Sequence, residues 1–170
     1  KPLIANSLYN SFGAKRVLDF SAGWGDRLVG FLASDAESYI GIDPNTKLHE
    51  PYKNISKPYK DKETKFICSP AEDVDYTKLK YDFSFASPPY FDLERYSQED
   101  TQSWKRYSSI ERWKCGFLFP TLKKVWESLD HNGRMVVNIS EVYYKGKIEQ
   151  ICSPMLKHMK SERATNKEEI

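Results

Sequence analysis

Short runs of β-forming residues alternate along this chain with stretches of helical spacing, and this alternation constrains the fold more than any other feature. We predict five strands, which are Arg16 to Phe20, Tyr39 to Asp43, Lys65 to Cys68, Asp82 to Ala86 and Arg134 to Ile139. We predict helices over Pro2 to Phe12, Asp26 to Ser34, Lys47 to Ile55, Ile110 to Leu129 and Lys147 to Lys160. Regular alternation of strand and helix is typical of an α/β fold with a mostly parallel sheet.

The segment from Tyr90 to Ser109 is long, polar and rich in aromatic residues, and it directly follows the fourth predicted strand. Structureless loops of this length are uncommon in compact domains unless they serve as lids or binding loops. We therefore predict a lid or a binding loop here. Pro120 and Pro154 predict a kink or a break in the two helices that contain them, because proline lacks the N–H group that a helix interior needs.

The length of 170 residues suits one domain with a sizeable core. We expect that domain over residues 1–160 and a charged, frayed tail over residues 161–170. The net charge of +2 permits a polyanionic partner without requiring one. Because there is neither an apolar run of membrane-spanning length nor a signal peptide, we expect no membrane association and an intracellular protein, cytoplasmic in a prokaryotic or phage setting.

The cysteines are few and widely spaced, at Cys68, Cys115 and Cys152. An odd number without a CxxC pair favours reduced thiols over a disulfide framework or a zinc site. The histidines are scattered as well, so the sequence predicts no metal site.

A glycine-rich turn joins the first predicted strand to the helix after it. Gly23 and Gly25 let the backbone turn tightly and approach a ligand, while the start of a helix presents free N–H groups. Taken alone, such a turn is equally compatible with a structural role. Asp43 shifts the interpretation, because a carboxylate at the end of the second strand can accept both hydroxyl groups of a ribose. Together these residues predict a cofactor that contains adenosine.

Two residues around this turn separate the candidate cofactors. A dinucleotide site usually continues as GxGxxG, but Leu28 occupies the place of the third glycine. Asp19, at the end of the first strand, would repel a pyrophosphate and suits a cationic ligand. S-adenosylmethionine carries an ammonium and a sulfonium, so Asp19 favours this methyl donor over NAD.

Ser87, Pro88, Pro89 and Tyr90 follow the fourth strand, at the edge of the sheet where α/β proteins bind ligands. The exocyclic amine of cytosine or adenine is a poor nucleophile, because its lone pair is delocalised into the ring. Acceptors at the Ser87 hydroxyl and the Pro88 carbonyl would hold its two hydrogens and aim the lone pair at a methyl group. Tyr90 would stack on the base, which must leave the helix stack to reach the site. A rigid structural turn is the alternative for the tetrad alone.

On these residues the chain resembles the Rossmann-like S-adenosylmethionine-dependent methyltransferases, and within them the amino-methyltransferases of DNA and RNA. Their catalytic tetrad is Asp, Asn or Ser followed by Pro-Pro and an aromatic residue. The Ser form is most associated with cytosine N4 and does not exclude the amines of adenine or guanine. Over about residues 1–140, the resemblance implies strand order 3-2-1-4-5 with helices on both faces. It implies that the cofactor is held by Lys1, Pro2, Asp19, Phe20, Ser21, Ala22, Gly23, Gly25, Asp43, Pro44, Glu72 and Asp73.

Within that set, Glu72 and Asp73 follow the third strand and should approach the adenine amine of the cofactor. A solvated acidic turn or a helix cap is the competing interpretation. Trp24 and Asp26 depart from the small or Thr-like residues that the resembling family often has.

Substrate contacts are expected from Tyr90, Phe91, Arg95 and Tyr96, because cations interleaved with aromatic rings suit phosphates and unstacked bases. Acidic residues dilute this pattern, and a solvated loop is the alternative. The terminal hairpin of the family is expected to be missing or drastically shortened. Target recognition would then rely on a separate subunit or on a homodimer.

The sequence thus predicts a methyltransferase for an exocyclic amine of a nucleic-acid base, cytosine N4 or adenine N6, with DNA favoured over RNA. An RNA base amino-methyltransferase is one alternative. A catalytically silent module of the same fold, binding nucleic acid or a partner, is another. An NAD-dependent oxidoreductase is disfavoured by Asp19 and Leu28.

Overall fold

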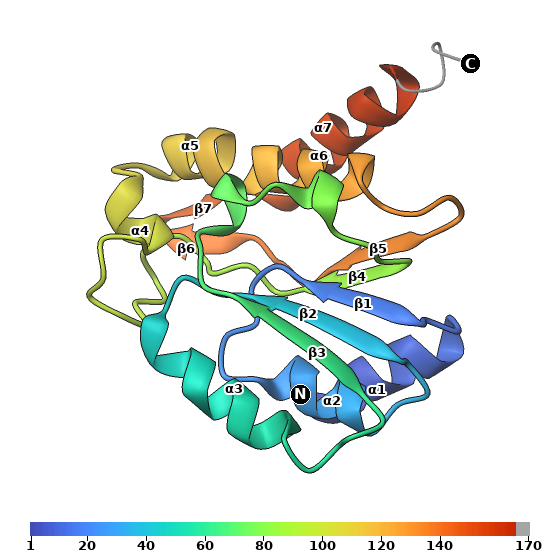
Figure 1. Cartoon of the computed structure of the whole chain (residues 1–170). Coiled ribbons are helices and arrows are strands. Elements are labelled where there is room, and N and C mark those ends of the chain that lie inside the picture. Colours follow the sequence, from blue (N-terminus) through green and yellow to red (C-terminus); the bar gives the residue numbers. More distant parts are fainter. Residues whose placement is uncertain (166–170) are drawn as a thin grey trace.

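A five-stranded parallel sheet forms the centre of the protein in this computed structural model, which describes residues 1–165 (Figure 1). The strands are β1 (Arg16–Asp19), β2 (Ser38–Ile42), β3 (Glu63–Ile67), β4 (Phe83–Ala86) and β5 (Arg134–Val137). Their order is β3-β2-β1-β4-β5, and each neighbouring pair is parallel. The α/β class and the predicted strand order are confirmed.

The central strands are buried on both faces, as expected for a parallel sheet covered by helices. Val17 and Leu18 of β1 are fully buried, and they belong to the two different core clusters on opposite sides of the sheet. β1 and β2 each end one residue earlier than predicted. Phe20 and Asp43 therefore stand in the turns after the strands, where their positions can shape a ligand site.

Helices α1 (Pro2–Ser11), α2 (Asp26–Leu32) and α3 (His49–Ser56) cover one face of the sheet (Figure 1). The 3-10 turn η1 (Thr46–Leu48) precedes α3. α1 and α2 approach closely at Gly30, where a Cβ atom would lie 2.5 Å from the carbonyl oxygen of Pro2. Glycine thus lets the two helices pack against each other beside the glycine-rich turn.

The second face is covered by α5 (Ile110–Trp113), α6 (Phe119–Glu127) and α7 (Cys152–Thr165) (Figure 1). A π-helical stretch, η4 (Lys114–Leu118), joins α5 to α6. Pro120 lies in the first turn of α6, where a missing N–H group is tolerated. The predicted kink or break in this helix therefore takes the form of a π-helical turn.

The last predicted helix, from Lys147, begins earlier than the helix of the structure, α7, which starts at Cys152. Residues from Lys147 form a hairpin instead, with β6 (Val142–Tyr144) antiparallel to β7 (Lys147–Glu149). Lys145 and Gly146 both have positive φ, at 49° and 83°, which is the backbone twist of a tight two-residue hairpin turn. The hairpin forms its own two-stranded sheet, so the terminal hairpin is short and separate from the main sheet.

Helix α7 continues to Thr165, so the prediction that this helix ends at Lys160 is wrong. Pro154 falls in its first turn rather than in its interior. The rest of the predicted tail, residues 166–170, lies outside the described residues. The limits of the predicted domain, residues 1–160, stay a prediction. None of the helices within residues 1–165 is long and apolar enough to cross a membrane.

Candidate functional site

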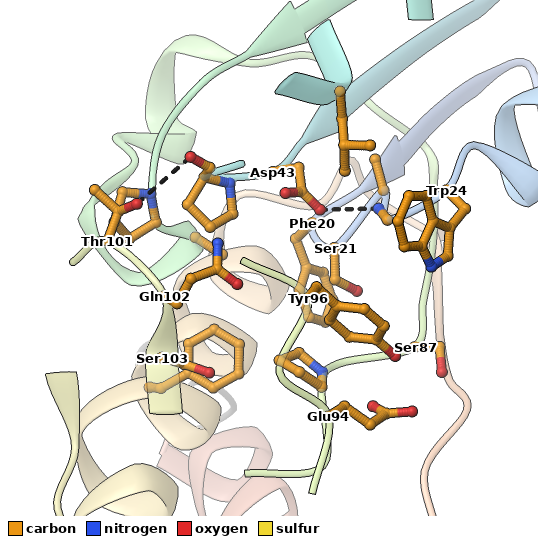
Figure 2. Close-up of a pocket in the computed structure, with 18 of the residues that line it drawn as sticks. Phe20, Ser21, Trp24, Asp43, Ser87, Glu94, Tyr96, Thr101, Gln102 and Ser103 are labelled. Atoms are coloured by element: carbon orange, nitrogen blue, oxygen red, sulfur yellow. Dashed lines mark hydrogen bonds between the residues drawn. The ribbon is translucent and has the colours of Figure 1, made fainter. Parts of the chain in front are cut away.

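A cavity lies at the carboxyl edge of the sheet, lined by residues that follow β1, β2, β3 and β4 (Figure 2). The predicted site residues that line it are Phe20, Ser21, Ala22, Gly23, Asp43, Pro44, Glu72, Ser87, Pro89 and Tyr96. The predicted residues outside its lining are Lys1, Pro2, Asp19, Gly25, Asp73, Pro88, Tyr90, Phe91 and Arg95. The structure therefore brings the glycine turn, the turns that contain Asp43 and Glu72, and the Ser-Pro-Pro turn together around one cavity.

The glycine turn and the carboxylate after β2 are joined by hydrogen bonds. The backbone N–H of Gly23 donates to Oδ2 of Asp43 over 2.9 Å (Figure 2), and the N–H of Asn45 donates to Oδ1 over 2.9 Å. Gly23 and Gly25 have φ of 54° and 85°, a region that strains other residues. Gly25 is the N-cap of α2. Burial raises the pKa of Asp43 despite these two backbone donors.

Asp19 does not face the cavity, which corrects the expectation that it contacts a cationic ligand. Its side chain is fully buried, and Oδ2 lies 2.7 Å from Nε of Arg27. The hydroxyl of Tyr39 donates to the same oxygen over 2.8 Å. The Asp19 charge is thus already paired inside the protein, and Arg27 is the member of this pair that lines the cavity. Burial alone would lower the pKa of Arg27, but the charge of Asp19 holds it above its usual value.

The acidic turn after β3, η2 (Ala71–Asp73), separates its two carboxylates. Glu72 is 7% exposed and lines the cavity. Its Oε1 accepts from the hydroxyl of Tyr107 over 2.9 Å and lies 2.9 Å from Nη1 of Arg106. Asp73 pairs with the same guanidinium at 2.8 Å and is half exposed. The solvated-turn interpretation therefore fails for Glu72, whose pKa is raised by burial.

In the Ser-Pro-Pro-Tyr turn after β4, Ser87 and Pro89 line the cavity. Nδ2 of Asn138, just after β5, donates to Oγ of Ser87 over 3.2 Å. Tyr90 packs against the core beneath the turn, and its backbone N–H donates to Oε2 of Glu94 over 3.0 Å. The tetrad is thus split between the cavity wall and the core.

Phe91 is a core residue, so its predicted role in substrate binding is wrong. It is 2% exposed, and its ring lies 5.5 Å from that of Tyr144 and 6.5 Å from that of Trp113. Phe91 adopts a positive φ of 50° at this point in the turn. The aromatic residues that line the cavity are Phe20, Trp24, Tyr96 and Phe117.

Residues 92–109, the rest of this segment, lie over the cavity and contain helix α4 (Ser103–Arg106). We call residues 92–109 the strap. It is attached to the turn after β2. The backbone N–H of Thr46 donates to Oε2 of Glu99 over 3.2 Å, and Oγ1 of Thr101 donates to the carbonyl oxygen of Pro44 over 3.5 Å (Figure 2). The predicted lid is therefore present as a covering segment.

The cavity under the strap measures about 180 Å³. Small-molecule pockets typically measure about 300–1,000 Å³. With the strap in this position, the cavity is therefore smaller than a typical small-molecule pocket.

Arg95 does not line the main cavity. Its guanidinium lies 4.8 Å from the ring centre of Trp104, and Nη2 lies 3.4 Å from Oδ2 of Asp92. It borders a second, shallower hollow together with Lys47. Arg95 is thus placed beside the site rather than in it.

Lys1 and Pro2, at the start of α1, also stand apart from the cavity. The amino group of Lys1 lies 3.4 Å from Oδ2 of Asp26, and both side chains are largely exposed. Asp26 itself lines the cavity, so this ion pair connects the start of α1 to the site.

The cavity is also lined by residues outside the predicted site set, among them Trp24, Arg27, Glu94 and Gln102, and Asn138 bonds to Ser87 beside it. Arg27 stands eight residues after Asp19, in the first turn of α2, and this spacing alone does not indicate that the two side chains pair. Gln102 lies in the strap and gives no signal of its own in the sequence. Its placement depends on how the strap folds back over the sheet.

Polar atoms in the cavity wall are left without partners. Oγ of Ser21 and Nε2 of Gln102 are buried and have no hydrogen-bond partner among the residues described. Buried polar groups are nearly always satisfied, so these two atoms are candidates for contact with a polar ligand. Within residues 1–165, no group of His, Cys, Asp and Glu side chains is arranged to hold a metal ion.

The sequence matches no family model and no curated protein. Solved structures are similar to it at low identity. An S-adenosylmethionine-dependent methyltransferase from Clostridium acetobutylicum aligns with a TM-score of 0.53 and 12% identity, over 80% of this chain and 47% of that one. The methyltransferase PaMTH1 from Podospora anserina, solved with S-adenosylhomocysteine bound, aligns with a TM-score of 0.53 and 16% identity, over 81% and 51%.

YcgJ from Bacillus subtilis aligns with a TM-score of 0.51 and 16% identity, over 79% of this chain and 49% of that one. The chain spans about half the length of each of these three structures. At such identities the likeness concerns the fold alone. Together with the observed strand order, it shows that the chain has the fold of the Rossmann-like methyltransferases.

Proposed function

We propose that this chain is an S-adenosylmethionine-dependent methyltransferase that acts on an exocyclic amine of a nucleic-acid base. The observation that carries the proposal is that Ser87 and Pro89 share one cavity with Asp43 and Glu72. A turn suited to an amine and two carboxylates suited to adenosine thus face the same space. Two ligands bound there would meet at the carboxyl edge of the sheet.

The residues around the cavity fit the cofactor part by part. Asp43 has oxygen lone pairs left for ribose hydroxyls after accepting its two backbone N–H groups. Arg27 presents a cation to the methionine carboxylate, and Glu72 presents an acceptor to the adenine amine. When bound, the cofactor supplies an electrophilic methyl group on a sulfonium. The S-adenosylhomocysteine bound to the Podospora anserina protein supports the same ligand class.

Ser87 and Glu94 are the acceptors placed to orient the target amine. Oγ of Ser87 accepts one hydrogen bond from Asn138, which leaves a lone pair for an amine hydrogen. Pro88 does not line the cavity, so the Glu94 carboxylate replaces its carbonyl as the second acceptor that we propose. In the transfer, the N–C bond forms as the C–S bond breaks, and the nitrogen then releases one proton. Glu94 is a carboxylate in the cavity wall that can take this proton.

Aromatic surface at the cavity mouth suits an unstacked base. Trp24 is 69% exposed, and its ring lies 6.2 Å from that of Tyr96 in an edge-to-face contact (Figure 2). A large exposed aromatic side chain beside a reaction site is a ready stacking partner, and each stacked base contributes about 1–3 kcal/mol. We therefore propose that the base lies against Trp24. DNA is our first candidate for its source and RNA the second.

The test is incubation with S-adenosylmethionine labelled in the methyl group, together with DNA and RNA, followed by mass analysis of the nucleosides. We expect label on cytosine N4 or adenine N6 of DNA. Label on RNA nucleosides alone would favour the second candidate. Binding of S-adenosylhomocysteine without any transfer to either nucleic acid would favour the catalytically silent module. Tight binding of NAD instead would overturn the cofactor assignment.

A further inference from the structure

Gln102 is a buried polar residue whose side-chain amide nitrogen, Nε2, donates no hydrogen bond to any residue that the structure describes. Its side chain is 7% exposed and lines the cavity (Figure 2). Nε2 lies away from solvent and finds no acceptor within residues 1–165. Leaving a buried donor unpaired is unfavourable, because the group has lost its hydrogen bonds to water without gaining another. An acceptor supplied by a ligand would remove this cost.

The backbone of Gln102 is held from several directions, so the amide is positioned rather than loose. Its carbonyl oxygen accepts the N–H groups of Lys105 and Arg106, over 3.0 and 3.1 Å. The preceding residue, Thr101, is bonded to the carbonyl oxygen of Pro44. Three residues back, Glu99 accepts from Thr46. The strap is thus attached to the turn after β2 on one side of Gln102.

On the other side of Gln102 the strap is attached to the acidic turn after β3. Arg106 lies 2.9 Å from Oε1 of Glu72, and Tyr107 donates to the same oxygen. Glu72 and Gln102 therefore line one cavity from two segments that an ion pair connects. One presents a carboxylate acceptor, and the other presents an amide donor.

A carboxylate acceptor and an amide donor in one cavity match the edge of an aminopurine. The exocyclic amine of adenine donates, and the ring nitrogens of adenine accept. On the basis of the proposed function, we propose that Gln102 recognises the adenine of the cofactor by donating from Nε2 to a ring nitrogen. The strap then belongs to the cofactor site itself, and adenine selectivity comes from Glu72 and Gln102 together.

Calorimetric titration with S-adenosylhomocysteine tests this without any need for turnover. Gln102→Leu keeps the size of the side chain and removes the donor, so we expect about a tenfold loss of affinity. Gln102→Glu places a carboxylate against ring nitrogens and should weaken binding further. The matched control is Gln98→Leu, at an exposed position in the same strap, which should bind like the wild type.

Analogues of S-adenosylhomocysteine in which N1, N3 or N7 of adenine is replaced by CH identify the acceptor. We expect the wild type to lose about tenfold on one of the three, and Gln102→Leu to bind that analogue and the parent equally well. If instead Gln102→Leu bound the parent and all three analogues more weakly than the wild type by the same factor, Gln102 would only support the strap. That result would overturn the proposal. So would unchanged affinity of Gln102→Leu for the parent. Failure of the wild type to bind S-adenosylhomocysteine would overturn the proposed function along with it.

Discussion

Arg27 and Asp19 form a buried ion pair, with 2.7 Å between Nε and Oδ2. The Asp19 side chain is fully buried, and that of Arg27 is 13% exposed. The pair crosses the glycine turn, because Asp19 ends β1 and Arg27 lies in the first turn of α2. The pair thus keeps the Arg27 cation at the cavity wall, while the Asp19 carboxylate that balances its charge is buried inside the protein.

Removing the charge of Asp19 should therefore destabilise the fold as well as the site. Asp19→Asn leaves the Arg27 guanidinium buried without a countercharge. Loss of one member of a buried pair typically costs about 3–5 kcal/mol, so we expect a loss in the unfolding free energy of that order. Urea unfolding followed by circular dichroism measures it.

The matched control is Glu37→Gln, which breaks an exposed pair with Lys15 at the opposite edge of the sheet. Exposed pairs of this kind contribute little, so its unfolding midpoint should stay at the wild-type value. If Asp19→Asn were as stable as this control, the buried pair would not stabilise the glycine turn.

Glu72 should make stability depend on pH in a recognisable direction. Burial raises its pKa above the usual 4.5, so the folded protein keeps a proton that the unfolded chain has already lost. The unfolding free energy contributed by this group therefore falls as pH rises from 4.5 through the raised pKa. Glu72→Gln removes this dependence, and the variant should gain stability relative to the wild type over that window. Urea unfolding at a series of pH values measures the difference.

Glu99 provides a control of opposite sign. The hydroxyl of Thr46 lowers the pKa of Glu99 below its usual 4.5, so its stabilising contribution is present above that pH and is lost as pH falls through the lowered pKa. Glu99→Gln should therefore lose stability relative to the wild type as pH rises toward 4.5. Identical pH profiles for the two variants would contradict the assignment of Glu72.

Trp24 should contribute to nucleic-acid affinity if the base stacks on it. Trp24→Ala removes an aromatic face that is 69% exposed, and we expect affinity for single-stranded DNA to fall about tenfold. Fluorescence anisotropy with a labelled oligonucleotide measures this. Tyr59→Ala is the control, since Tyr59 is 44% exposed and precedes β3, at the edge of the sheet away from the cavity. Equal losses from both variants would mean that the site does not include Trp24.

The strand order and the position of the cavity could be predicted because their determinants are local. Buried β-forming runs mark β1, β2 and β4, and glycines with positive φ mark the turn after β1. The position of Asp43 after a strand predicts that it belongs to the site, and in the structure Asp43 lines the cavity. The hairpin was missed because Lys145 adopts a positive φ that its residue type does not suggest.

The partners of the site residues could not be predicted in the same way. Asp19 was expected to meet a ligand, but Arg27 folds back across the turn and takes that place. Thr46 and Glu99 lie 53 residues apart, and only the closed strap brings them together. Such contacts depend on side-chain directions in the assembled fold, which spacing along the chain does not encode.

Cofactor affinity should depend on Asp43. Asp43→Asn keeps one acceptor oxygen and replaces the other with an NH2 group. This donor would face the backbone N–H of Gly23 or of Asn45, which is itself a donor, so one hydrogen bond is lost. We expect affinity for S-adenosylhomocysteine to fall about tenfold through lost hydrogen bonds to the ribose. Calorimetric titration measures it, with the exposed Asp35→Asn as control. Unchanged affinity in Asp43→Asn would place the ribose elsewhere.

Ser87 should affect transfer and leave cofactor affinity alone, the reverse of Asp43. Ser87→Ala removes the hydroxyl that accepts from Asn138 and that we propose orients the amine. Losing one positioned hydrogen bond at a reacting centre lowers turnover by about a hundredfold, and binding of S-adenosylhomocysteine should stay at the wild-type level. Single-turnover transfer of labelled methyl to an oligonucleotide measures the rate, with the exposed Ser140→Ala as control. If Ser87→Ala transferred methyl at the full rate with the base bound, the Ser-Pro-Pro turn would have only a structural role.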